Sequence, residues 1–308
     1  MVLEWCGDPP PSSQSVPLRL AAALHALVLT GAPDLAAVYP PRSDSATDDE
    51  FWGVCLHCFE VERKFVLDWL QSPPQTNEVR RSNAIYPGLA LIAAETKVEK
   101  LSLLELGASA GLNLVCDRFQ YDFGDGLLRG ETGSALSLKP EWRGNPPPDA
   151  AISIVARAGC DQNPMNIRDD RDLLRLRAYT WPDQTDRLER LDAAAKIARD
   201  VLASDALNKC DVGQWLEERL ASPLADTVSV IFHSIAWQYF SSETVTRCQS
   251  AIERAASRAT ASSPLAWLAM EDDDGPEGAA IRLQIWPQGI DRIIGRADFH
   301  GRWISWMG

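Results

Sequence analysis

One segment constrains the fold of this chain more than any other: residues 101–113, which read LSLLELGASAGLN. Mostly apolar residues lead to an acid, small residues follow, and a helical pattern then begins. This order predicts a strand, a glycine-rich turn and the start of a helix. In open α/β folds such a turn lies at the carboxyl edge of a parallel sheet, where small ligands bind.

The rest of the chain predicts two regions of different character. Residues 1–97 show helical periodicity at 18–30, at 48–72 and at 78–96, where Pro87 and Gly88 should break or kink the helix. Residues 98–308 alternate strands and helices, with an insertion at about 119–150. We therefore expect a helical N-terminal cap followed by an α/β domain with a mostly parallel sheet. The predicted strands are residues 101–106, 151–157, 227–232 and 265–270, followed by an antiparallel terminal hairpin at 281–286 and 290–295.

The charge of the chain limits the kinds of molecule that it is expected to bind. The net charge is −13, and acids exceed bases both before and after residue 100. Such a balance repels nucleic acid and anionic lipid, so the expected partner is a small molecule. Seven cysteines at irregular spacings do not form a disulfide framework. The apolar stretch at 18–30 is too short to span a bilayer. We expect a cytoplasmic protein, and the sequence leaves its oligomeric state open.

The glycine turn has the spacing E-x-G-x-S-x-G. A dinucleotide fingerprint would need glycine at Ser109 and Leu112, and the Gly-Lys-Ser/Thr of a phosphate-binding loop is absent. An acid followed by G-x-x-x-G resembles the first motif of S-adenosylmethionine-dependent methyltransferases. Glu105 would receive the ammonium group of that ligand, and N–H groups at the helix start would hold its carboxylate. The expected cofactor-binding residues of the turn are Glu105, Gly107, Ala108, Ser109, Gly111 and Asn113.

A competing interpretation takes Gly107-Ala-Ser109-Ala-Gly111 as the nucleophile elbow of a serine hydrolase. An acid among residues 272–274 and His300 would complete a triad in the usual order. The elbow of an α/β-hydrolase normally follows several strands, whereas the first hundred residues here are helical in pattern. A third alternative is a non-catalytic binding protein that keeps the fold without the chemistry.

Longer motifs show a second resemblance. Residues from about 70 to 308 resemble a bacterial group known as domain-of-unknown-function family 2332, and this resemblance implies a methyltransferase-like fold with a helical N-terminal part. The motifs that carry it are Asn77-Glu78-Val-Arg80, Glu105-Leu-Gly-Ala-Ser-Ala-Gly-Leu-Asn-Leu114 with Asp117-Arg118-Phe119, Glu141-Trp-Arg-Gly144, Gly159-Cys-Asp-Gln-Asn-Pro164, Trp181-Pro-Asp-Gln184 with Arg187 and Arg190-Leu-Asp192, Phe232-His-Ser234, and Gly301-Arg-Trp303.

The methyltransferase pattern assigns roles to three further residues. Asp161, at the end of the second strand, would bind the ribose hydroxyls, and Asp211 would bind the adenine amino group. His233, at the end of a later strand, is the candidate general base. Asp161 follows Gly111 by 50 residues, against about 20 in a compact βαβ unit, so the segment at 119–150 must be an insertion.

Two clusters have simpler interpretations. Cys55-Leu-His57-Cys58 has some spacing of a zinc site, but both cysteines fall on the apolar stripe of a predicted helix. Core packing is therefore expected there. The acids at 272–274 predict an exposed loop. We expect no metal site.

Overall fold

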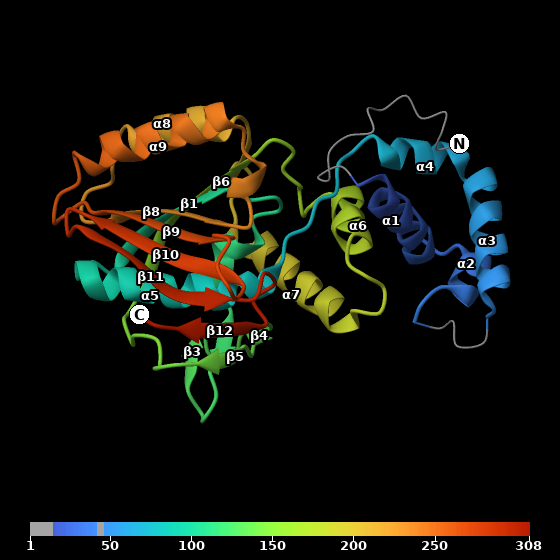
Figure 1. Cartoon of the computed structure of the whole chain (residues 1–308), viewed down its shortest axis with the longest axis horizontal. Helices are drawn as coiled ribbons and strands as arrows, with labels where there is room; N and C mark the ends of the chain where they lie inside the picture. The colour runs from blue at the N-terminus through green and yellow to red at the C-terminus, as the bar shows by residue number, and fades with distance from the viewer. Residues whose placement is uncertain (1–14, 42–45) are drawn as a thin grey trace. The chain divides into compact units, whose positions relative to one another are not determined.

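The computed structural model describes residues 15–41 and 46–308 (Figure 1). The chain divides into two compact units. The first contains residues 1–76 and 166–192, and the second contains residues 77–165 and 193–308. This division differs from the expected boundary at residue 97, because α5 (Ser82–Thr96) packs on the sheet of the second unit. It differs again at 166–192, because α6 (Asp170–Ala178) packs against α1 (Val16–Leu29) of the first unit.

The first unit is built from helices. Small residues on α1, among them Ala22 and Ala26, allow close packing against α4 and α6, where Val66, Trp69 and Tyr179 complete a buried cluster. Arg175 lies over the ring of Trp69, 4.4 Å from its centroid. The helices of this unit are α1, α2 (Pro33–Val38), α3 (Asp48–Val61), α4 (Arg63–Leu70), α6 and the first part of α7 (Thr185–Val201), which continues into the second unit.

The helix expected at 48–72 is two helices, α3 and α4, which meet at Glu62. Thr47 begins α3 with a capping box, in which its hydroxyl accepts from the N–H of Glu50 and the Glu50 side chain accepts in return. Cys55 and Cys58 are buried, whereas His57 is exposed. The two cysteines therefore pack in the core, as their place on the apolar stripe predicts.

The second unit contains a large mixed sheet of nine strands in the order β5-β12-β11-β10-β9-β8-β1-β6-β7. Neighbours from β9 to β7 run parallel, and β9, β10, β11 and β12 form an antiparallel meander, so the expected terminal hairpin is confirmed as β10–β11. β1 is buried along almost its whole length, which explains its apolar sequence. The strands are β1 (Lys100–Leu106), β5 (Glu141–Arg143), β6 (Ser153–Asp161), β7 (Leu207–Lys209), β8 (Val228–Ser234), β9 (Leu265–Glu271), β10 (Ala279–Trp286), β11 (Ile290–Ala297) and β12 (Trp303–Trp306).

Helices cover both faces of this sheet (Figure 1). α8 (Val212–Leu220) and α9 (Ser242–Ala256) lie side by side on one face, where their apolar residues join those of β1, β6 and β8 in one core. α5 lies against β9 and β10, and it stays helical through Pro87. The expected break is therefore absent. Burial of nearly every residue of α5 holds the helix around its proline.

The segment expected as an insertion forms a small second sheet in the order β3-β2-β4. β2 runs antiparallel to β3 but parallel to β4. Its strands are β2 (Gln120–Asp122), β3 (Leu128–Gly130) and β4 (Ser137–Leu138). Arg157 on β6 anchors its start through two hydrogen bonds to Asp117, at 2.6 and 2.7 Å.

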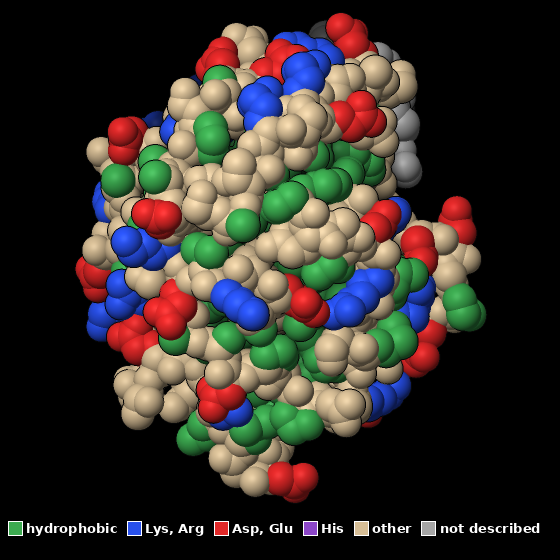
Figure 2. Space-filling view, turned by 90° about the vertical axis from the view of Figure 1, so that its left-hand side faces the viewer, with side chains coloured by type: hydrophobic (Ala, Val, Ile, Leu, Met, Phe, Trp, Pro, Cys, Tyr) green, Lys and Arg blue, Asp and Glu red, His purple; other side chains and the backbone are tan. Residues whose placement is uncertain are grey.

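On the face drawn in Figure 2, basic and acidic side chains are interspersed, with hydrophobic side chains between them. Neither sign of charge dominates this face. Across residues 15–41 and 46–308, no helix has both the length and the apolar character needed to cross a membrane.

Candidate functional site

The turn after β1 depends on left-handed backbone at alternate positions. Gly107, Ser109 and Gly111 have φ of +69°, +51° and +69°. Glycine adopts this conformation without a steric penalty, which explains two of the three positions. Ser109 does so at a cost, because its Cβ crowds the backbone in this region. The predicted glycine turn is therefore present, and its serine occupies a strained position.

β6 holds this turn in place. The N–H of Ser109 donates to Asp161 Oδ2 at 2.9 Å, and the N–H of Ala108 donates to the carbonyl of Cys160 at 3.0 Å. Gly159 permits this contact, because a Cβ there would lie 2.7 Å from that of Ala108. Asp161 therefore contacts the glycine turn directly. The sequence predicted both features at the carboxyl edge of the sheet.

The carboxylate of Asp161 accepts hydrogen bonds from the protein backbone. Its Oδ1 accepts the N–H of Asn163 at 2.8 Å, while its Oδ2 accepts that of Ser109. Both oxygens of this carboxylate are therefore already bound to the backbone.

Glu105, one residue before the end of β1, is a buried acid with an unpaired carboxyl oxygen. The residue is 3% exposed, and its Oε2 has no hydrogen-bond partner. Burial, followed by the nearby charge of Asp161, raises the pKa of Glu105 well above its usual value. Asn113 donates to Glu105 and accepts from the hydroxyl of Ser82 at 2.8 Å.

The helix after the turn differs from the expectation. Residues Leu112–Arg118 form a kinked 3₁₀-helix, η4, in place of an α-helix. The N–H of Leu112, which was expected to face a ligand carboxylate, donates to Asn77 Oδ1 at 2.9 Å. Gly111 instead permits packing, since a Cβ there would lie 3.0 Å from Leu207. The donors at residues 109 and 112 are thus used by the chain's own side chains.

His233 lies in a closed hydrogen-bond network at the end of β8. Its Nδ1 lies 2.7 Å from Glu271 Oε1, and its Nε2 accepts from Trp267 Nε1 at 2.9 Å. Its ring also stacks on that of Trp237, with centroids 4.9 Å apart. His233 was predicted to be a general base. In the structure it is buried, and both of its ring nitrogens are bound by the protein.

Asp211 lies after β7 and caps α8. Its carboxylate accepts from the N–H of Gln214 at 3.1 Å, from the hydroxyl of Thr244 at 3.1 Å and from Arg247 at 3.4 Å. The N–H of the preceding residue, Cys210, donates to the carbonyl of Asp161. Asp211 thus lies at the same sheet edge as Asp161, in a capping role that sequence spacing did not predict.

Sequence reasoning gave little weight to Arg81 and did not identify Glu271. Arg81 donates to the carbonyls of Ser234 and Phe299, each at 3.0 Å, and its charge opposes the rise in the pKa of Glu105. Glu271 ends β9 beside His233. Reading the carboxyl end of every predicted strand would have identified Glu271, because β9 was predicted to end one residue before it.

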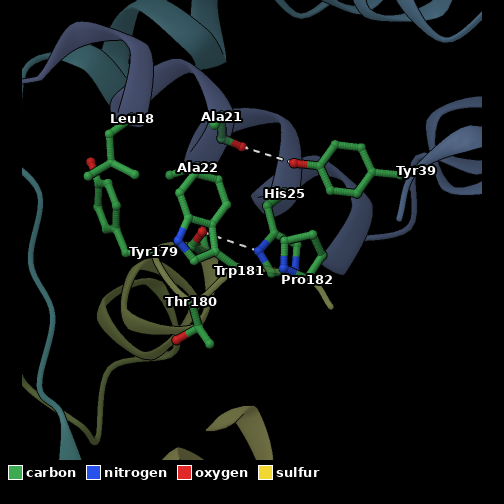
Figure 3. Close-up of a pocket in the computed structure, with 10 residues that line it drawn as sticks. Leu18, Ala21, Ala22, His25, Tyr39, Tyr179, Thr180, Trp181 and Pro182 are labelled. Carbon is green, nitrogen blue, oxygen red and sulfur yellow. Dashed lines mark hydrogen bonds between the residues drawn. The ribbon is translucent and has the colours of Figure 1, made fainter. Parts of the chain in front are cut away.

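Two hollows elsewhere in the molecule are poor candidates for a functional site. In the first unit, residues around His25 line a space of about 10 Å³, room for one water at most (Figure 3). Tyr39 donates to the carbonyl of Ala21 there, and burial lowers the pKa of His25. In the second unit, a hollow of about 360 Å³ lies at the start of β6, at the opposite end of that strand from Asp161. Its Arg118 pairs with Asp117 and Glu131.

Metal-binding geometry is not evident at these positions. In the part of the chain that the structure describes, no group of three or more His, Cys, Asp or Glu side chains could hold a metal ion. The six cysteines described in the structure are free thiols, five of them buried.

Comparison with known proteins identifies the family. A family model described as "Uncharacterized protein conserved in bacteria" matches residues 1–306. This chain belongs to domain-of-unknown-function family 2332. The match includes the N-terminal helices, which lie outside the motifs at 70–308. No curated protein and no solved structure matches the chain.

Proposed function

We propose that this family member binds S-adenosylmethionine at the carboxyl edge of β1 and β6 and transfers its methyl group to a small molecule. The observation that carries the proposal is the orphaned Oε2 of Glu105. A buried carboxyl oxygen without a partner costs about 1–3 kcal/mol. The ammonium group of a ligand's amino-acid end would supply both the missing hydrogen bond and an opposite charge.

The charge at this edge favours a cationic ligand over a phosphorylated one. The charge of Asp161 is the second cause, after burial, of the raised pKa of Glu105, so the two carboxyl groups lie near each other. The carboxylate of Asp161, and that of Glu105 once an ammonium group faces it, would repel the phosphates of a dinucleotide, whereas an ammonium and a sulfonium outweigh one carboxylate in S-adenosylmethionine. Asp161, which accepts the backbone N–H groups of Ser109 and Asn163, is the residue we propose as the acceptor for the ribose hydroxyls.

The sheet order supports the same location. From β1 the chain proceeds outward to β6 and β7, and then returns to the other side of β1 with β8 and β9. Ligands of open α/β sheets bind where the strand order reverses in this way, outside the carboxyl ends of the strands. Glu105 lies one residue before the end of β1, the strand at which the order reverses.

When bound, S-adenosylmethionine supplies an electrophilic methyl group for an in-line displacement. The residues of the chain then need to orient the two reactants and exclude water. Glu105 would hold the amino-acid end, and the turn at 107–111 would hold the adjoining part of the ligand. Residues 235–240 pass over the turn, because a Cβ on Gly107 would meet Ala236 at 2.8 Å and Phe240 at 3.8 Å.

A thermal-shift panel tests the proposal. S-adenosylmethionine and S-adenosylhomocysteine share the amino-acid end and should both raise the melting temperature, whereas NAD should not. At 100 times the dissociation constant the expected stabilisation is about 2.7 kcal/mol. A stabilisation by NAD alone, or by none of the three, would overturn the proposal.

One observation favours the serine-hydrolase alternative. The φ of +51° at Ser109 gives the strained serine that a nucleophile elbow requires. The triad expected for it would use His300, which is exposed in the structure, and an acid among residues 272–274. His233 is not an alternative base, because its ring nitrogens are bound to Glu271 and Trp267. Covalent labelling by a fluorophosphonate that disappears in Ser109→Ala would favour the hydrolase over the methyltransferase.

A further inference from the structure

One carboxylate oxygen of Glu271 links the ends of β8 and β9 to the loop that follows β8. Its Oε1 lies 2.7 Å from Nδ1 of His233 and accepts the N–H groups of Ala236 and Trp237, at 2.9 and 3.1 Å. His233 ends β8, Glu271 ends β9, and the two N–H groups belong to the loop at residues 235–240. A single carboxylate thus fixes where this loop begins.

Hydrogen-bond chemistry defines the state of His233. The indole N–H of Trp267 can only donate, so His233 Nε2 must accept and carry no proton. The proton of the neutral ring therefore lies on Nδ1, where it donates to Glu271. His233 is consequently an anchor for the Glu271 carboxylate and has no lone pair left for a substrate proton.

The anchored loop lies directly over the glycine turn. Its first residue, Ile235, has φ of +49°, a conformation that a β-branched side chain rarely adopts. Its second residue, Ala236, comes so close to Gly107 that a Cβ there would lie 2.8 Å from its own. The backbone therefore needs external bonds to keep this path, and Glu271 provides two of them.

We propose that Glu271 is a positioning residue for the ligand site: it holds the loop at 235–240 against the glycine turn and thereby sets the affinity for S-adenosylmethionine. This inference rests on the proposed function for its effect on affinity. The loop would form one wall of the site, opposite the turn. Without Glu271 the strained path from Ile235 to Ala236 would relax, and the wall would move away from Gly107.

Two variants separate positioning from general damage. Glu271→Ala removes the acceptor, whereas Glu271→Gln keeps an oxygen that can accept the same N–H groups. We expect Glu271→Ala to increase amide exchange at Ala236 and Trp237 and to weaken S-adenosylmethionine binding at least tenfold in calorimetry. Glu271→Gln should restore both to within about threefold of wild type. Glu253→Ala, at an exposed position on α9, is the matched control.

Calorimetry and amide exchange together distinguish a failure of this inference from a failure of the proposed function. If the wild type binds S-adenosylmethionine and Glu271→Ala binds it equally well, the positioning role is wrong and the proposed function stands. If the wild type does not bind it, the proposed function falls, and amide exchange alone decides whether Glu271 fixes the loop. Unchanged exchange at residues 236 and 237 in Glu271→Ala overturns the inference in either case.

Discussion

Asp161 Oδ2 accepts the backbone N–H of Ser109 at 2.9 Å, so the end of β6 holds the turn that follows β1. Asp161→Asn should disturb this bond or the one from Asn163, because an amide nitrogen would then face a backbone donor. We expect a loss of about 1–3 kcal/mol in the free energy of unfolding, measured by urea titration. Asp149→Asn, at a side chain that is 81% exposed, should change it little. Equal effects of the two variants would contradict this role for Asp161.

The buried carboxyl of Glu105 should make stability depend on pH. Because burial raises its pKa above the usual 4.5, the folded protein keeps this proton to a higher pH than the unfolded chain does. Its contribution to stability is therefore present at low pH and is lost as pH rises from about 4.5 through the raised pKa. Thermal unfolding of Glu105→Gln, which cannot titrate, should show a stability relative to wild type that grows across this window. A difference that is constant with pH would contradict the burial argument.

Gly107 should tolerate alanine less well than a glycine of the same backbone conformation. Gly107→Ala combines φ of +69° with a 2.8 Å approach to Ala236, whereas Gly289 has φ of +70° and open space around it. The backbone cost of about 1–2 kcal/mol is common to both substitutions. Crowding should add about 1–3 kcal/mol at Gly107 alone, measured by chemical denaturation. Equal losses would mean that the loop moves aside freely.

The ion pair at the start of the insertion should contribute far more than its counterpart in the terminal hairpin. Arg157 and Asp117 are 10% and 14% exposed, whereas Arg282 and Asp291 are 56% and 45% exposed. Arg157→Ala leaves the buried Asp117 with only its longer contact to Arg118, at 3.4 Å, and should cost up to about 3–5 kcal/mol. Arg282→Ala should cost at most about 1 kcal/mol. Denaturant unfolding of both variants tests this, and a small loss for Arg157→Ala would contradict the anchoring role.

Long apolar strands and the glycine turn could be predicted because their signals are local. β1, β6, β8 and β9 are each a run of apolar residues, and the antiparallel hairpin β10–β11 alternates around its turn. In the large sheet, three short strands escaped prediction: β5, β7 and β12. Each of them adds to an edge or to the antiparallel end of the sheet. Their pairing depends on distant partners, such as Trp142 opposite Ile304, that no local pattern reveals.

The sequence predicted where the candidate site lies, but not which hydrogen bonds its residues make. Strand ends placed Glu105, Asp161 and His233 at one edge, because parallel strands share their carboxyl ends. The partners of those side chains depend on residues far apart in the sequence. His233 meets Glu271 across 38 positions, and Leu112 donates to Asn77 across 35. These contacts give both ring nitrogens of His233 a protein partner and occupy an N–H that was expected to face a ligand.

Calorimetric titration of S-adenosylmethionine into the wild type and into Glu105→Gln tests the central claim most directly. Glu99→Gln, at an exposed acid just before β1, is the matched control. The wild type and the control should bind alike. Glu105→Gln should bind about 10 to 150 times more weakly, since a hydrogen bond to a charged group contributes about 1.5–3 kcal/mol. Binding by Glu105→Gln as tight as that of the wild type, or no binding by the wild type, would contradict the account.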